Sequence, residues 1–222
     1  MSDGLVGSRA VSERLDPYKM PAAGVGQRIG LFGGSFNPPH KGHRHVALMA
    51  LSRLALHKVW WLVTPGNPLK SSDGLPPLDT RIAETRGLAD HPRMVVTGFE
   101  ASIGVRYSAD AILHVRRRAP AAKFVWVMGA DNLANLHRWQ KWREIMRRVP
   151  VAVINRPGAS MAALSSPAAR AFAGARRPEA EAAALADMAA PAWVFLHVPL
   201  DPVSSTLLRL LRDRRGGAAA SS

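Results

Sequence analysis

Short and almost wholly apolar runs alternate with stretches of helical periodicity along this chain, and that alternation restricts the possible folds more than any other feature. Continuous apolar runs are typical of strands that are buried on both faces, as in parallel sheets. The intervening helices would form the crossovers that parallel strands require. The pattern therefore predicts an α/β fold, a Rossmann-like, doubly wound and mainly parallel sheet with helices on both faces. The expected strands span 29–32, 59–64, 94–97, 124–128, 151–154 and 193–198, and the expected helices span 44–56, 78–89, 108–117, 142–148 and a last one from 204.

The length of 222 residues suits one domain with a single hydrophobic core. Residues 1–26 carry scattered charge, two prolines and several glycines without periodicity, which predicts a poorly ordered extension. We therefore expect a single domain over 27–213 and a flexible tail over 214–222. The Ala-rich stretch 159–190 is interpreted as a helical pair that covers the sheet.

Composition excludes several classes of protein. The absence of cysteine excludes disulfides, thiolate zinc sites and cysteine nucleophiles. No apolar run approaches the length of a membrane span and no secretory signal begins the chain, so we expect a cytoplasmic protein without a membrane segment. The formal net charge of +14 predicts attraction to a polyanion, which leaves nucleic acid, an acidic membrane surface and phosphate-rich substrates open. The oligomeric state is also left open, a homo-oligomer included.

The segment directly after the first expected strand reads GGSFNPPHKGH and spans residues 33–43. Its glycines let backbone N–H groups approach a phosphate, its prolines stiffen the turn, and the helix that follows offers its positive N-terminal end. The spacing matches neither a dinucleotide-binding loop nor a Walker loop. The segment therefore predicts an anion-binding loop of another kind.

Two histidines, His40 and His43, stand three residues apart where this loop enters the helix. At that spacing both imidazoles can face one ligand, and they suit phosphate oxygens on which charge builds up. They could equally be ordinary packed or surface histidines, or form a metal site with His45. The metal site is disfavoured because a carboxylate or a fourth ligand is lacking nearby in the sequence.

Five separated motifs between Arg28 and Arg212 resemble those of the nucleotidyltransferase superfamily, and in particular those of bacterial nicotinate-nucleotide adenylyltransferases. The 33–43 loop resembles the T/HxGH phosphate-binding loop of that superfamily, and residues 1–26 have no counterpart in the family. The other four motifs are NPLK at 67–70, GADN at 129–132 followed by Trp139, RPG at 156–158 and VSSTLLR at 203–209, which resemble NPxK, the GxD and tryptophan segment, RPG and ISSTxxR.

The resemblance implies two substrate sites and Mg²⁺ as the cofactor, held mainly by the ATP phosphates, with no metal ligand assigned to the protein. The ATP site would comprise Gly33, Gly34, Ser35, Phe36, His40, His43, Asp131, Arg156, Ser205, Thr206 and Arg209. The nicotinate mononucleotide site would comprise Asn37, Lys70, Tyr107, Ser108 and Trp139. The catalytic counter-charge would come from His40, His43, Lys70 and Arg209.

The activity that the resemblance implies is transfer of AMP from ATP to nicotinate mononucleotide, giving deamido-NAD and pyrophosphate. The acceptor phosphate would attack the α-phosphorus in line, without a covalent enzyme intermediate. A related adenylyltransferase acting on nicotinamide mononucleotide or phosphopantetheine is the nearest alternative. A basic nucleic-acid-binding protein is an alternative of another class, disfavoured because no aromatic-studded strand or recognition helix accompanies the charge.

Most of these residues also have a plainer interpretation. Ser108, Asp131, Ser205 and Thr206 are common helix caps, Lys70 is a typical solvated lysine, and Arg156 only precedes a Pro-Gly turn. Trp139 has polar neighbours and is expected to present its face to a pyridine ring, whereas Trp142 is expected to pack. The basic runs at 116–118, 147–148 and 212–215 are interpreted as solvated helix ends, where the helix dipole favours cations.

Overall fold

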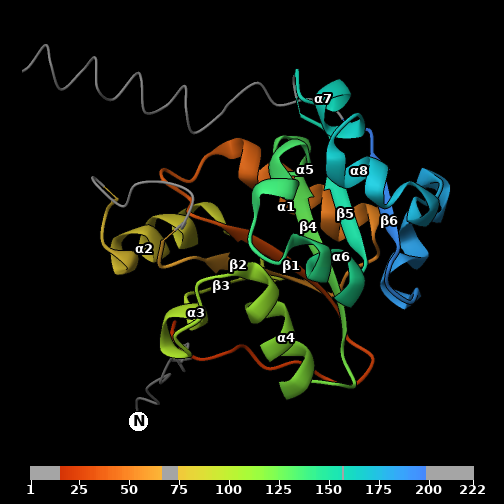
Figure 1. Cartoon of the computed structure of the whole chain (residues 1–222). Coiled ribbons are helices and arrows are strands. Elements are labelled where there is room, and N and C mark those ends of the chain that lie inside the picture. The colour runs from red at the N-terminus through yellow and green to blue at the C-terminus, as the bar shows by residue number, and fades with distance from the viewer. Residues whose placement is uncertain (1–15, 67–74, 157, 199–222) are drawn as a thin grey trace, which may run out of the picture.

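The chain forms a wholly parallel six-stranded sheet in a computed structural model that describes residues 16–66, 75–156 and 158–198 (Figure 1). The strand order is β3-β2-β1-β4-β5-β6. From the central β1 the chain builds outward in one direction and then returns to build outward in the other, so the predicted doubly wound sheet is confirmed. The strands are β1 (Arg28–Gly34), β2 (Lys58–Val63), β3 (Met94–Thr97), β4 (Lys123–Gly129), β5 (Val151–Ile154) and β6 (Trp193–Leu196).

Helices cover both faces of the sheet, as expected (Figure 1). Apolar residues of α1, α2 and η3 join the core on one face, and those of α3 to α8 join the core on the other. The α-helices are α1 (Lys41–Arg53), α2 (Leu78–Leu88), α3 (Phe99–Ser102), α4 (Ser108–Arg118), α5 (Ala130–Asn135), α6 (Trp142–Arg148), α7 (Ser160–Leu164) and α8 (Pro167–Ala171), and the 3₁₀ helices are η1 (Leu136–Arg138), η2 (Ala173–Ala175) and η3 (Glu179–Asp187).

Strand β2 shows why an unbroken apolar run marks a strand of this fold. Trp60 belongs to the core on one face, Trp61 belongs to the core on the other, and both side chains are fully buried. Alternate side chains of a strand point to opposite faces, so a sheet with two covered faces needs apolar residues at every position.

The Ala-rich stretch 159–190 is not the expected helical pair. It forms α7 and α8 followed by the 3₁₀ helices η2 and η3. Pro167 begins α8, Gly174 lies within η2, and Pro178 directly precedes η3. Proline cannot donate the hydrogen bond that would continue a helix, and glycine weakens one, so the stretch is divided into short turns. The helix expected from 204 lies outside the described residues.

Residues 16–26 differ from the poorly ordered extension that was expected for 1–26. The carbonyl of Pro17 accepts hydrogen bonds from Gly98 N (2.8 Å) and Thr97 Oγ1 (3.0 Å), and the Tyr18 hydroxyl donates to Asp79 at the start of α2. This segment is ordered by contacts to distant elements, which leave no periodic pattern in its own sequence. The rest of the expected extension at 1–15, the expected end of the domain at 213 and the expected tail at 214–222 lie outside the described residues and stay predictions.

No helix in the described part of the chain is long and apolar enough to cross a membrane. The expected cytoplasmic location stays a prediction.

Candidate active site

The carboxyl ends of β1 and β4 lie side by side, although the chain leaves β1 toward one edge of the sheet and leaves β4 toward the other. Such a switch point is where doubly wound sheets bind ligands. The 33–43 loop spans the end of β1, Asp131 follows β4, and Arg156 follows β5. The topology therefore brings these three predicted parts of the ATP site to the carboxyl ends of neighbouring strands.

Aromatic packing against the sheet anchors the 33–43 loop. The Phe36 side chain is 2% exposed, and its ring centroid lies 5.4 Å from that of Phe32 and 5.1 Å from that of Trp61. Phe36 has a φ of 43°, a left-handed value that is uncommon for an aromatic residue and that directs its ring inward. The Phe36 side chain therefore anchors the loop in the core, which leaves only its backbone for the nucleotide contact expected from the sequence.

Gly33 has a packing role beside the phosphate-binding role that was expected of it. A Cβ atom at this position would lie 2.6 Å from Cη2 of Trp126, whose side chain is buried on the adjacent strand β4. Any larger residue would force this ring away from β1. Packing against Trp126 is thus a second reason for a glycine at position 33, beside the expected approach of a phosphate.

The structure brings the two loop histidines together, as their spacing predicted. His40 precedes the first residue of α1, His43 lies in its first turn, and their ring centroids are 3.7 Å apart. Nδ1 of His43 accepts a hydrogen bond from the backbone N–H of His40 (3.2 Å). Because that nitrogen is an acceptor, the neutral ring of His43 carries its hydrogen on Nε2, which leaves one N–H donor for a ligand.

Burial holds the pKa of His43 well below the usual value of 6.5, and the positive charges of His40 and Arg156 lower it further. His43 is therefore neutral at physiological pH. The sequence interpretation gave it a share of the catalytic counter-charge. Its neutral ring can instead offer a ligand a hydrogen bond from Nε2 without a full positive charge.

Asp131 and Arg156 face each other across the ends of β4 and β5, with Arg156 Nη1 3.6 Å from Asp131 Oδ1. The Arg156 side chain is 17% exposed and the Asp131 side chain 50%. Gly129 is the N-cap residue of α5, and no side-chain hydrogen bond caps that helix, so the plainer interpretation of Asp131 as a cap is wrong. Since Arg156 also influences the pKa of His43, these three side chains share one electrostatic environment.

Gly129 makes room for this pair, and replacing Gly129 by alanine is expected to disturb it. The new Cβ would lie 2.5 Å from Asp131 Oδ1 and 2.8 Å from Arg156 Cδ, so both side chains must shift while the strand stays in place. We expect the KM for ATP to rise about tenfold, since small displacements of binding groups are costly. Steady-state kinetics and thermal unfolding of the variant test this.

Gly87→Ala is the matched control, because a Cβ at Gly87 in α2 would meet nothing within 4 Å. Its KM should be unchanged, and its stability should be equal or higher because alanine favours a helix. An unchanged KM in Gly129→Ala would contradict the expected place of Asp131 and Arg156 in the ATP site.

The segments expected to bind the nicotinate nucleotide lie on neighbouring elements. Tyr107 precedes α4, Ser108 is its first residue, and no side-chain hydrogen bond caps this helix, so Ser108 is not the cap of the plainer interpretation. Trp139 follows η1 and is partly exposed. An ion pair of 2.9 Å between Lys141 and Asp110 joins the Trp139 segment to the first turn of α4.

Trp142 is buried, as expected for a packing residue. Its ring contacts Phe172 at 5.9 Å between centroids, and the guanidinium of Arg143 covers its face at 4.3 Å. Of the two tryptophans in this segment, Trp139 is thus the one whose side chain is partly exposed and accessible to a ligand.

Four predicted site residues lie outside the described residues: Lys70, Ser205, Thr206 and Arg209. Their roles, including the counter-charge expected of Lys70 and Arg209, stay predictions.

Sequence reasoning missed Arg81, whose guanidinium donates to the carbonyl oxygens of Ser35 (3.0 Å) and Thr64 (2.7 Å). Its side chain is 1% exposed. A signal was present in the sequence, since Arg81 shares the buried face of α2 with Ile82 and Thr85. An arginine at a core-facing position of a helix indicates a buried cation with specific partners.

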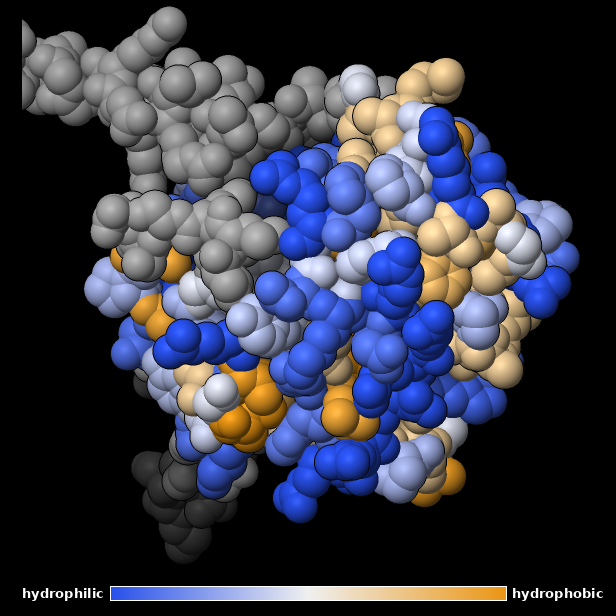
Figure 2. All heavy atoms as spheres, viewed as in Figure 1, coloured by the Kyte–Doolittle hydropathy of each residue, from blue (hydrophilic) through white to orange (hydrophobic). Residues whose placement is uncertain are grey.

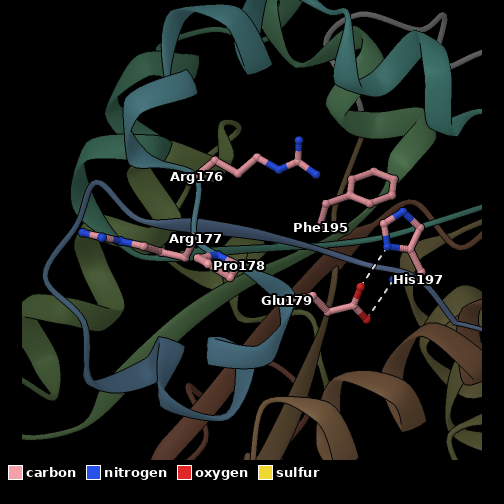
Figure 3. A pocket seen from close by; sticks show the side chains of 6 residues that line it. All are labelled: Arg176, Arg177, Pro178, Glu179, Phe195 and His197. Carbon is pink, nitrogen blue, oxygen red and sulfur yellow. Dashed lines mark hydrogen bonds and ion pairs between the residues drawn. The ribbon is translucent and has the colours of Figure 1, made fainter.

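A separate cavity of about 300 Å³ lies beside β6, and no predicted site residue lines it (Figure 3). Glu179 there accepts hydrogen bonds from His197 and pairs with Arg53 at 2.8 Å. The lining residues are Arg176, Arg177, Pro178, Glu179, Phe195 and His197.

The basic runs of α4 and α6 lie at the ends of their helices, as expected. Hydrophilic residues predominate on the molecular face that carries these two helices (Figure 2). The run at 116–118 is exposed in the last turn of α4, and Arg148 pairs with Glu144 at 3.0 Å. These charges are solvated or paired within their own helices, which is the plainer interpretation of the basic runs.

The family model described as cytidylyltransferase-like matches residues 31–211 of this chain. The chain belongs to the cytidylyltransferase-like family. It is 58% identical over 182 residues to a probable nicotinate-nucleotide adenylyltransferase of Methylorubrum extorquens, covering 82% of this chain and 98% of that protein. It is 54% identical over 190 residues to a protein of the same description from Cereibacter sphaeroides, covering 86% and 98%. The resemblance drawn from the five motifs is thereby confirmed.

A solved structure supports the fold independently of close sequence similarity. The nicotinic acid mononucleotide adenylyltransferase of Plasmodium falciparum, complexed with NaAD, matches 82% of each chain with a TM-score of 0.61 at 14% sequence identity.

Proposed function

We propose that this chain transfers the adenylyl group of ATP to nicotinate mononucleotide, forming deamido-NAD and pyrophosphate. The observation that carries the proposal is the close pair of His40 and His43, whose ring centroids lie 3.7 Å apart at the start of α1, on a glycine loop at the switch point of the sheet. The relatives named for this reaction support the choice of acceptor.

The loop and its surroundings are suited to an ATP triphosphate. The positive N-terminal end of α1 favours phosphate oxygens, Nε2 of His43 offers a hydrogen bond, and Arg156 adds a full charge. An oxygen of the acceptor phosphate forms a bond to the α-phosphorus, and the bond from that phosphorus to the pyrophosphate oxygen breaks. Positioning and charge stabilisation are then the main tasks of the protein.

For the acceptor we propose Tyr107, Ser108 and Trp139 on the nicotinate side, with Asn37 and Lys70 on the phosphate side. Stacking of the pyridine on Trp139 would contribute about 1–3 kcal/mol by analogy with bases on aromatic side chains. For the ATP phosphates we further propose the segment with Ser205, Thr206 and Arg209, where each charge-assisted hydrogen bond is worth about 1.5–3 kcal/mol.

Nucleotidyl transfer in this family uses a metal with ATP, and we propose Mg²⁺. The described residues include no cluster of three His, Asp or Glu placed to hold a metal ion, which also disfavours the alternative site at His40, His43 and His45. A metal that arrives on the triphosphate fits such a donor set, with Asp131 as the nearby carboxylate. The metal would neutralise charge on the phosphates.

The test is an assay of pyrophosphate release from ATP and Mg²⁺ with nicotinate mononucleotide, nicotinamide mononucleotide or phosphopantetheine, the product being identified by mass. Release with nicotinate mononucleotide, at a kcat/KM well above that with the other two, is expected. Preference for another acceptor would keep the nucleotide half of the proposal and reject the acceptor half. Tight, salt-sensitive binding to nucleic acid without turnover would favour the basic nucleic-acid-binding alternative.

A further inference from the structure

The hydrogen-bonded ladder between β1 and β2 stops just short of the candidate active site. Its last pair is Gly34 with Val63, followed by one hydrogen bond from Thr64 N to Gly34 O (3.0 Å). Beyond this point the sequence after β1 continues into the 33–43 loop, and the sequence after β2 continues toward the NPLK motif at 67–70. The backbone ladder therefore does not fix the two segments to each other where substrates would bind.

Arg81 of α2 bridges the segments that follow β1 and β2 at this point. Its Nη1 donates to the carbonyl oxygens of Ser35 (3.0 Å) and Thr64 (2.7 Å). Its Nη2 donates to the carbonyl of Pro65 (3.2 Å), and its Nε donates to that of Pro76 (3.0 Å). One side chain thus joins the end of β1, the end of β2 and the segment that leads into α2.

We propose that Arg81 is a positioning residue, which holds the 33–43 loop in its nucleotide-binding geometry by tying Ser35 to the end of β2; this inference rests on the proposed function. All four acceptors among the described residues are backbone carbonyls, so the Arg81 side chain constrains the backbone of the segments it contacts. The planar guanidinium supplies donors in a fixed fork that an ammonium group cannot reproduce. Its 1% exposure shows that the fork is fully enclosed.

The bridge matters for function because of where Ser35 lies. It stands between Gly34 at the end of the ladder and Phe36, whose left-handed backbone turns the loop toward His40 and His43. Release of the Ser35 carbonyl would let the backbone N–H groups of the loop move relative to the histidines. A displacement near 1 Å lowers catalysis by about 10²-fold in well-ordered sites.

The experiment compares Arg81→Lys and Arg81→Ala with the wild type and with Arg86→Ala, a control at an exposed arginine in the last turn of the same helix. It measures the Kd for ATP by calorimetry, kcat and KM with nicotinate mononucleotide, and the melting temperature without ligand. Both Arg81 variants are expected to weaken ATP binding about tenfold or more and to lower kcat. The control should match the wild type.

Two readouts separate positioning from stability alone. Added guanidinium ion should partly restore ATP affinity in Arg81→Ala, where it fills the vacated site, and should not do so in the wild type. A purely structural role would lower the melting temperature and leave the Kd for ATP and kcat of the folded protein within about twofold of wild type, which would overturn the proposal. Failure of both variants to fold would assign Arg81 to stability and also overturn it.

Failure of the proposed function is recognised separately in the same experiment, because it appears in the wild type. A wild-type protein that transfers no adenylyl group to nicotinate mononucleotide would reject the reaction. A wild-type protein that does so, beside equally active Arg81 variants, would reject only the positioning role.

Discussion

Replacing His43 by alanine is expected to lower kcat by about 10²–10³-fold, the usual effect of removing one preorganised donor to developing charge. The physical reason is the Nε2–H of the neutral ring, which the hydrogen bond between His43 Nδ1 and His40 N holds in one tautomer. The melting temperature should change little, because the side chain is partly exposed and lies at the edge of the core. Initial rates at saturating ATP and acceptor measure kcat, and thermal unfolding measures the melting temperature.

His57→Ala is the matched control for this change. Nδ1 of His57 accepts a hydrogen bond from the backbone N–H of Arg28 (2.9 Å), so the same kind of contact is lost. His57 precedes β2 and therefore lies at the amino ends of the strands, opposite the candidate site. This variant should keep wild-type kcat, and near-normal turnover of His43→Ala would reject the catalytic role of His43.

The pH dependence gives a second check on His43. Its folded-state pKa is lowered, so the ring stays neutral as the pH falls through 6.5, and the advantage of the wild type over His43→Ala should persist there. Protonation at still lower pH would place a hydrogen on Nδ1 and remove the contact to His40. Because the unfolded chain binds this proton first, His43 also makes stability fall as the pH drops below 6.5.

The parts of this structure that follow from local periodicity were predictable from the sequence. The apolar runs at 59–64 and 124–128 indicate strands with two covered faces, and the sheet order places the motifs that follow β1, β4 and β5 together. The spacing of His40 and His43 likewise predicts their contact, because residues three apart at a helix start share a face.

The parts that depend on long-range contacts were not predictable in the same way. The position of Arg81 on the core-facing side of α2 indicates a buried cation, but its partners, the carbonyls of three separate segments, could not be read from the sequence. Residues 16–26 look unstructured because their order comes from hydrogen bonds to Thr97, Gly98 and Ser102. The charge state of His43 depends on burial, on His40 and on Arg156, and of these the motif reveals only His40.

Glu100 in α3 is a buried carboxyl group that the sequence also gave no reason to single out, and its replacement by glutamine is expected to stabilise the protein at alkaline pH. The side chain is 5% exposed, and burial raises its pKa from 4.5 to about 7. Between those values the folded state binds more protons than the unfolded state, so this group makes stability fall as the pH rises toward and through 7. At about 1.4 kcal/mol for each pKa unit, the full penalty above pH 7 is about 3 kcal/mol.

Glu100→Gln keeps the shape of the protonated acid and cannot ionise, so its free energy of unfolding should match that of the wild type only below the unfolded-state pKa of 4.5, near pH 4, and exceed it near pH 8 by up to about 3 kcal/mol. Denaturant unfolding at the two pH values measures the difference. Glu181→Gln, at an exposed position of η3, should shift stability equally at both. A Glu100→Gln variant that is less stable than the wild type near pH 8 would show that the folded protein stabilises the carboxylate, the opposite of what burial alone predicts.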